Sequence, residues 1–175
     1  HLVRRADYRD FAILYRGNHQ SRIMEMKLQQ NRIPYKINGG TSFFAKAEIK
    51  DLMSYLRLLI NPDDDAAFLR IINTPRREIG AATLEKLNDY SAVRGVSLSA
   101  ASSEIGLRQH LSAKSGARLE RFSAWLERTI HKLHTVEDPV VVIREMLTDI
   151  NYEAWLRQDS QSDKMAEKRL ANVHI

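Results

Sequence analysis

Residues 47–72, AEIKDLMSYLRLLINPDDDAAFLRII, carry the pattern that decides the fold. Apolar side chains recur in the first half at the spacing i, i+3, i+4, i+7, which is typical of an amphipathic helix. They are Ile49, Leu52, Met53, Leu56, Leu59 and Ile60. Asn61-Pro62 ends this helix, and the acidic run 63–65 supplies a cap and a negatively charged first turn for the next. The stretch therefore predicts one helix after another.

The helical pattern continues from Thr74-Pro75, where the second helix stops, to the end of the chain. Short helices and loops are expected over 96–116, which is rich in Ser, Ala and Gly. Longer helices are expected over 81–94 with Gly95 past its end, around 119–133, from Asp138-Pro139 onward, over 151–157 and over 164–175.

The N-terminal part has a different pattern. Residues 10–16 (DFAILYR) and 33–37 (IPYKI) favour strands, and 19–30 between them favours a helix. A strand, a helix and a strand predict a piece of an α/β domain, which needs further strands to complete a sheet. The shift near 44–47 predicts a boundary between an α/β part, 1–46, and a helical part, 47–175.

Composition excludes several classes of protein. The 175 residues contain no Cys, so a disulfide scaffold and a thiolate metal site are excluded. No run of 18 apolar residues is present, so we expect no membrane span and a cytoplasmic location. A net charge of +5 is compatible with a nucleic-acid partner without demonstrating one. Because the chain lacks an initial Met and its last helix meets the chain end, we expect a piece of a longer protein.

The sequence predicts no catalytic site and no metal site. It has no G-x-x-x-x-G-K-[ST] loop and no H-E-x-x-H motif. His131 and His134 share a helix face, but no third ligand is apparent. Residues 104–134 carry six Lys or Arg against three Glu, which we interpret as a solvated helix face.

Two basic stretches are candidate binding sites. In YRGNHQSR (15–22), an aromatic, a cationic and an amide side chain follow the first predicted strand, which is where open α/β sheets bind ligands. In NTPRREIG (73–80), paired arginines precede a glycine that opens a helix, as in a helix-hairpin-helix that holds DNA backbone. The alternatives are a polar strand-to-helix loop and an ordinary helix–helix turn with surface arginines.

Several motifs together resemble the superfamily 1A DNA helicases of the UvrD/PcrA/Rep type, and within them the Rep branch. The motifs are YRGNHQSR (15–22), GGTSFF (39–44), EIKD (48–51), YLRLL (55–59), NPDDD (61–65), TPRREIG (74–80), NYEAWL (151–156) and EKRLANV (167–173). The resemblance implies that 1–46 is the first part of RecA-like subdomain 2A and 47–175 most of the helical insertion subdomain 2B.

The resemblance also implies residue roles. Tyr15, Arg16 and Asn18 would contact single-stranded DNA, and Gly39-Gly40 would be the hinge about which 2B swivels. Duplex DNA would be contacted by Thr74, Arg76, Arg77, Ile79 and Gly80. Glu78 stands where the family has the first glycine of its hairpin. The lost glycine and the added negative charge oppose a close approach of the backbone to phosphate at this residue.

The whole helicase of this family uses ATP and Mg²⁺ and moves 3′ to 5′, whereas the nucleotide-binding motifs lie outside these 175 residues. The resemblance therefore implies no cofactor in this chain and no catalysis by it alone. DNA is the expected partner, bound without sequence specificity. Replisome or repair proteins are further expected partners, and the chain could form a homodimer by exchange of strands or domains. The alternative function is a protein-interaction or autoinhibitory module with little DNA binding of its own.

Overall fold

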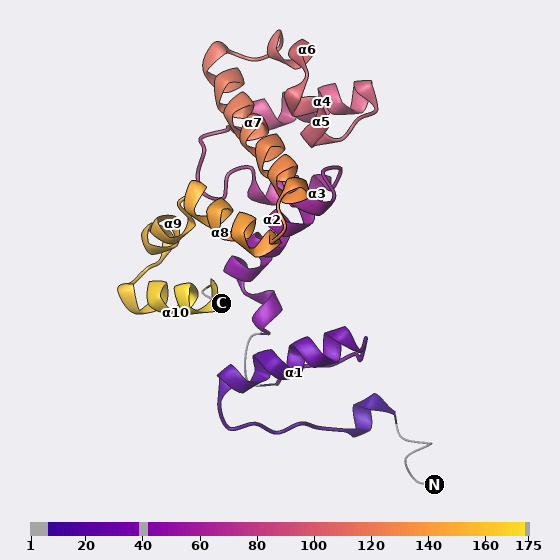
Figure 1. The fold of residues 1–175 in the computed structure, drawn as a ribbon, viewed down its shortest axis with the longest axis vertical. Helices are drawn as coiled ribbons and strands as arrows, with labels where there is room; N and C mark the ends of the chain where they lie inside the picture. Colours follow the sequence, from indigo (N-terminus) through magenta and orange to yellow (C-terminus); the bar gives the residue numbers. More distant parts are fainter. Residues whose placement is uncertain (1–6, 39–41, 174–175) are drawn as a thin grey trace. The chain divides into compact units, whose positions relative to one another are not determined.

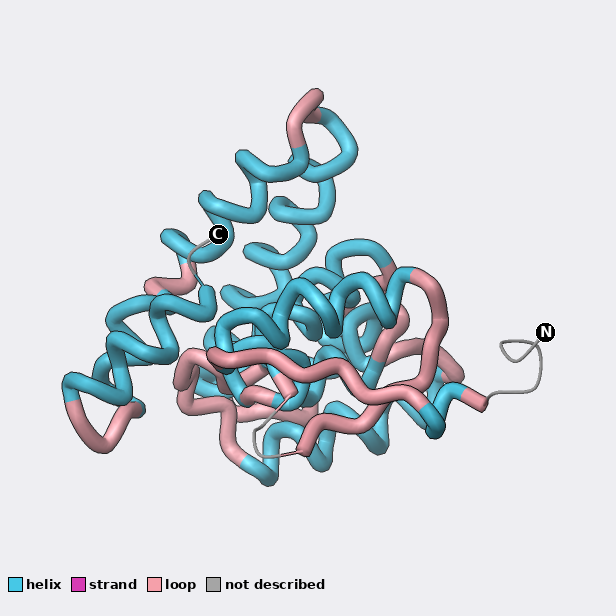
Figure 2. Tube along the Cα trace, turned by 90° about the horizontal axis from the view of Figure 1, so that it is seen from below, coloured by secondary structure: helices cyan, strands magenta, loops and turns pink. Residues whose placement is uncertain are grey.

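The computed structural model describes residues 7–38 and 42–173, and the regular structure in these ranges is helical. Figure 1 shows the helices in chain order, and Figure 2 shows that helices and loops make up the described chain. The predicted mainly α fold is therefore confirmed.

Ten α-helices and two short 3₁₀ helices lie in the described ranges. The N-terminal elements are η2 (Tyr8–Asp10), α1 (Asn18–Gln30), η3 (Phe43–Ala45), α2 (Ala47–Ile60) and α3 (Asp65–Ile71). The central elements are α4 (Ala81–Arg94), α5 (Leu98–Ser103), α6 (Ile105–Arg108) and α7 (Ala113–Thr135). The C-terminal elements are α8 (Pro139–Asp149), α9 (Tyr152–Asp159) and α10 (Asp163–Val173).

Local side chains explain where these helices begin and end. The Asp64 carboxylate accepts a hydrogen bond from the backbone N–H of Ala67 at 2.9 Å and caps α3. Asp138 caps α8 in the same way, by accepting from Val140 N–H at 2.9 Å. α4 ends at Gly95, whose φ of +66° is the left-handed conformation that glycine adopts readily. The predicted starts at 63–65 and 138–139 and the predicted stop at Gly95 are confirmed.

The two predicted strands are wrong. Residues 11–15 and 33–37 belong to no strand, and the described ranges contain no β-ladder. The helix predicted between them is present as α1. A strand exists only when its backbone N–H and C=O groups pair with a neighbour, and an apolar sequence does not provide that neighbour. Residues 7–38 and 42–46 therefore lack the sheet of the predicted α/β piece.

The chain divides into two compact units, His1–Lys50 and Asp51–Ile175. In the first unit, the buried carboxylate of Glu25 on α1 is the centre of a polar cluster. It accepts hydrogen bonds from the backbone N–H of Phe43 at 3.1 Å, from the Tyr35 hydroxyl at 3.2 Å and from the Ser42 hydroxyl. The guanidinium of Arg22 lies 4.7 Å from the centre of the Phe43 ring. These contacts attach η3 to α1.

The second unit contains the main hydrophobic core. α5 packs against α3, α4 and α7, and α7 packs in turn against α8. The largest fully buried side chains of this core are Tyr55, Phe68, Leu58, Leu59, Ile71, Ile72, Leu87, Leu107, Leu119, Leu126 and Met146. A smaller cluster lies between α9 and α10, around Tyr152, Leu156, Leu170 and Val173.

The buried carboxylate of Asp51 connects α2 to α3 and α9 within the second unit, by an ion pair with the exposed Arg70 and a hydrogen bond from Tyr152. Asp51 of α2 lies 2.7 Å from a guanidinium nitrogen of Arg70 and accepts a hydrogen bond from the Tyr152 hydroxyl at 3.2 Å. Burial raises the pKa of the Asp51 carboxyl above its ordinary value, and the positive charge of Arg70 only partly opposes this.

Candidate functional site

The connection between α3 and α4, residues 72–80, is the centre of the candidate site. The side chain of Asn73 closes it by donating to the Ile79 carbonyl at 2.7 Å and accepting from the Ile79 N–H at 3.1 Å. The Thr74–Pro75 peptide bond in this loop is cis. Because one amide side chain satisfies both backbone groups of Ile79, the loop has a defined shape before any ligand binds.

Arg77 holds the loop onto the end of α3. One of its terminal nitrogens donates to the carbonyls of Ile71, Ile72 and Pro75 at 2.7, 3.2 and 3.2 Å. The other donates to the Tyr55 hydroxyl at 2.7 Å. The Ile71 carbonyl also accepts from the Thr74 N–H at 3.0 Å, so the guanidinium adds a charged donor at the end of α3, where carbonyls lack partners within the helix.

The Tyr55 hydroxyl extends this network to Thr74. It accepts from Arg77 and donates to the Thr74 carbonyl. Burial raises the pKa of the Tyr55 phenol, which keeps its proton available for that donated bond.

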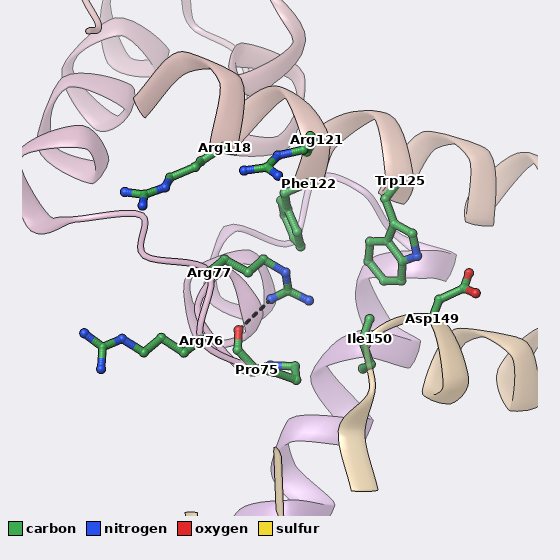
Figure 3. A pocket seen from close by; sticks show the side chains of 9 residues that line it. All are labelled: Pro75, Arg76, Arg77, Arg118, Arg121, Phe122, Trp125, Asp149 and Ile150. Atoms are coloured by element: carbon green, nitrogen blue, oxygen red, sulfur yellow. Dashed lines mark hydrogen bonds between the residues drawn. The ribbon is translucent and has the colours of Figure 1, made fainter. Parts of the chain in front are cut away.

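Aromatic rings of α7 lie against the Arg77 guanidinium. It is 4.8 Å from the ring centre of Phe122 and 5.9 Å from that of Trp125, within the range of cation–π attraction. Figure 3 shows the guanidinium of Arg77 directed inward beside these rings, whereas Arg76 extends away from them. Adjacent arginines therefore have different environments: Arg77 is half-buried within the protein and Arg76 is exposed.

A hollow of about 350 Å³ lies between the loop and α7. Arg76 and Arg77 line it from the loop, and Arg118 and Arg121 line it from α7 (Figure 3). The remaining lining residues are Pro75, Phe122, Trp125, Asp149 and Ile150. Four guanidinium groups against one carboxylate give the hollow a positive potential, and the neighbouring rings lower the local dielectric and strengthen it.

The predicted duplex-contacting residues are placed differently by the fold. Arg76 and Gly80 are exposed and Thr74 is half-buried. The side chain of Ile79 is 3% exposed and belongs to the core, so only its backbone could meet a ligand. Gly80 is the N-cap of α4 and has a φ of −72°, which any residue can adopt.

The predicted single-strand site precedes α1. Tyr15 is half-buried and Arg16 exposed, and the Gln20 side-chain oxygen accepts the backbone N–H of Arg16 at 3.0 Å and that of Gly17 at 3.1 Å. Gln20 thus fixes the chain direction just before the helix. Asn18 is the first residue of α1. The side chain of Asn18 and the predicted hinge, Gly39 and Gly40, lie outside the described residues.

Sequence reasoning missed the contribution of α7. Arg118, Arg121 and Trp125 are spaced by three and four residues, so they share one face of the helix. The mixture of Lys, Arg and Glu over 104–134 suggested a helix face of mixed charge. The glutamates do not share the face of these arginines, because Glu120 pairs with Arg108 and Glu127 accepts from Ser103, and neither lines the hollow. A search for basic and aromatic residues at helical spacing would have found it.

The described residues form neither a metal-binding cluster nor a membrane-spanning helix. Within residues 7–38 and 42–173, no three His, Asp or Glu side chains lie close enough together to hold a metal ion. No helix in the same ranges is long and apolar enough to cross a membrane.

The described chain is thus a mainly helical protein with an arginine-lined hollow beside a helix–helix turn. It belongs to the family described as the UvrD-like helicase C-terminal domain, whose model matches residues 1–173.

Named relatives show the same kinship. The chain is 54% identical over 174 residues to ATP-dependent DNA helicase Rep of Salmonella typhimurium, covering 99% of this chain and 26% of that protein. It is 38% identical over 167 residues to ATP-dependent DNA helicase PcrA of Bacillus subtilis, covering 94% of this chain and 22% of that protein. It is 42% identical over 135 residues to DNA helicase II of Escherichia coli, covering 74% of this chain and 19% of that protein. The chain therefore spans about a quarter of the length of such relatives.

Proposed function

We propose that this chain is part of an ATP-dependent DNA helicase that moves 3′ to 5′, and that it contributes contacts to DNA and regulation of unwinding. Residues 1–46 would belong to motor subdomain 2A and 47–175 to the inserted subdomain 2B. ATP and Mg²⁺ would bind to other parts of the helicase, since this sequence has no phosphate-binding G-x-x-x-x-G-K-[ST] loop. The location would be the bacterial cytoplasm, at the nucleoid.

One observation carries the proposal: the loop 74–80 is held rigidly by Arg77 while Arg76 remains exposed beside the arginines of α7. A preorganised loop with free cations can approach the phosphate backbone without reading bases. In this proposal Arg76 and the backbone at Gly80 contact duplex DNA near Thr74, and Arg77 positions the loop. Tyr15, Arg16 and Asn18 contact the single strand.

A salt titration with forked DNA tests the proposal. The 175-residue chain should bind a fluorescent fork at 50 mM salt and lose affinity steeply by 200 mM, because binding releases counterions from phosphate. Arg76→Ala should weaken binding and lower the slope of log affinity against log salt by about one. Lys168→Ala, at an exposed position of α10, removes the same charge away from the loop and should change the affinity less.

Other outcomes would contradict the DNA role. No binding at 50 mM salt would do so, and so would equal effects of Arg76→Ala and Lys168→Ala. Binding of a replisome or repair protein that persists at 200 mM salt, without DNA binding, would support the protein-interaction module instead.

A further inference from the structure

Glu78 has an unusual conformation at the edge of the hollow. Its φ is +56°, a left-handed conformation that costs energy for any residue with a Cβ atom. The Arg118 side chain holds both parts of this residue: one terminal nitrogen pairs with the Glu78 carboxylate, and the other donates to the Glu78 carbonyl at 3.1 Å. Arg118 thereby fixes Glu78 against α7.

The arginines of the hollow are not equally engaged. Arg77 is bound to the end of α3, and Arg118 is paired with Glu78. Arg76 and Arg121 are exposed, and neither forms an ion pair or hydrogen bond with any other residue that the structure describes. Two guanidinium groups are thus free to bind an anion, and a third, that of Arg118, is held by the carboxylate and the backbone carbonyl of Glu78.

We propose that this hollow is a phosphate-binding site and that the Glu78 carboxylate occupies Arg118 until a phosphate displaces it. The proposal rests on the proposed function, and its ligand is a phosphodiester group of a nucleic-acid backbone. Arg121 and Arg76 bind the incoming phosphate, and Arg118 turns from Glu78 to the same group. Glu78 therefore lowers the affinity of the chain for DNA.

The exposure of Glu78, the acidic partner of the half-buried Arg118, lowers the free-energy cost of this exchange. The Glu78 side chain is 59% exposed, so water screens its attraction to Arg118, and such pairs contribute little net free energy. A phosphate meeting several arginines gains charge-assisted hydrogen bonds that match the planar guanidinium. The phosphate is attracted by Arg76 and Arg121 as well as by Arg118, whereas the Glu78 carboxylate pairs with Arg118.

Charge and conformation at position 78 can be tested separately. Glu78→Gln removes the negative charge and keeps a side chain of the same length, whereas Glu78→Gly also relieves the left-handed backbone. Glu85→Gln is the matched control, because Glu85 is an exposed acid of the neighbouring helix α4 that does not line the hollow.

Binding of the 175-residue chain to fluorescent duplex DNA at 50 mM salt is the first measurement. Glu78→Gln should bind about two- to fivefold more tightly than the wild type, and Glu85→Gln should change the affinity less. With Arg118→Gln already present, Glu78→Gln should lose most of its effect, because no arginine remains to be released. An unchanged affinity, or the same gain in the Arg118→Gln background, would overturn the proposal.

Titration with inorganic phosphate separates this proposal from the DNA role. Nuclear magnetic resonance signals of the Arg118 and Arg121 side-chain N–H groups should shift, and Glu78→Gln should give larger shifts at the same phosphate concentration. If these signals respond while no variant binds duplex, the phosphate site stands and the DNA role fails. If duplex binds while neither arginine responds to phosphate, the site proposed here is wrong.

Discussion

At the scale of single residues, a tertiary contact determines which of two adjacent arginines, Arg76 and Arg77, is exposed. The sequence TPRREIG presents them as equivalent neighbours. The aromatic face of α7, about 45 residues further along the chain, determines that Arg77 turns inward beside Phe122 and that Arg76 stays outside. No local pattern contains that information, so sequence could predict a basic turn but not which arginine meets a ligand.

Arg77→Ala should lower the free energy of unfolding by about 2–3 kcal/mol, because it removes the charged donor from the Ile71 and Ile72 carbonyls and from the Tyr55 hydroxyl. Arg77→Lys should recover less than half of that loss, since an ammonium group cannot reproduce the planar fork of donors. Arg76→Ala, at the exposed neighbour, should change stability by less than about 0.5 kcal/mol. Urea unfolding followed by circular dichroism measures all three, and equal losses for the two alanine variants would contradict the assigned roles.

The buried Asp51 should give a recognisable pH dependence. Its pKa is raised above 3.8, so the folded state keeps this proton to a higher pH than the unfolded state does. The contribution of Asp51 to stability is therefore greatest below pH 3.8 and declines as the pH rises through the folded-state pKa. Asp51→Asn does not titrate, so its free energy of unfolding relative to the wild type should increase over that range.

Asp64 provides the control of opposite sign. The N–H of Ala67 lowers the pKa of the Asp64 carboxyl below 3.8, so its contribution is present above pH 3.8 and is lost as the pH falls through the folded-state pKa. Asp64→Asn should therefore become relatively less stable as the pH rises. Urea unfolding between about pH 3 and pH 7 tests both variants, and slopes of the same sign would contradict the assignment.

At the scale of elements, helices were predictable and strands were not. The ends of α3, α4 and α8 follow from Asp64, Gly95 and Asp138, whose effects act within four residues. The segments 10–16 and 33–37 have the composition of strands, but a strand depends on a partner elsewhere, and in the described ranges they are not paired. The α7 wall of the hollow was likewise missed because its role depends on packing against another element.

Two glycines at the ends of α4 make a paired test of this local control. Gly95→Ala should cost about 1–2 kcal/mol, because its φ of +66° is strained for any residue with a Cβ atom even though no atom lies within 4 Å of the added methyl. Gly80→Ala, with a φ of −72° and equally open surroundings, should change stability by less than about 0.5 kcal/mol. Thermal unfolding distinguishes them, and equal costs would show that the backbone conformation is not the cause.

At the scale of the whole molecule, the two units have unequal cores. Both hydrophobic clusters are formed by residues beyond Asp51. In the first unit, Phe11, Ile13, Leu14 and Ile23 are more than half exposed, and the cluster around Glu25 is polar. Since burial of apolar area is the main stabilising contribution, the first unit should open at a lower free energy than the second.

Hydrogen exchange measures this difference directly in the intact chain. Backbone amides of α1 should exchange at least about ten times faster than those of α7, whose buried face includes Leu119, Phe122 and Leu126. Glu25→Gln should accelerate exchange in α1 further, by weakening the bonds to Ser42 and Phe43, while leaving exchange in α7 unchanged. Equal protection in the two helices, or faster exchange in both α1 and α7 of the variant, would mean that the units unfold as one. Independent opening would instead mean that Glu25 stabilises the first unit locally, by holding Ser42 and Phe43 in the segment that precedes α2.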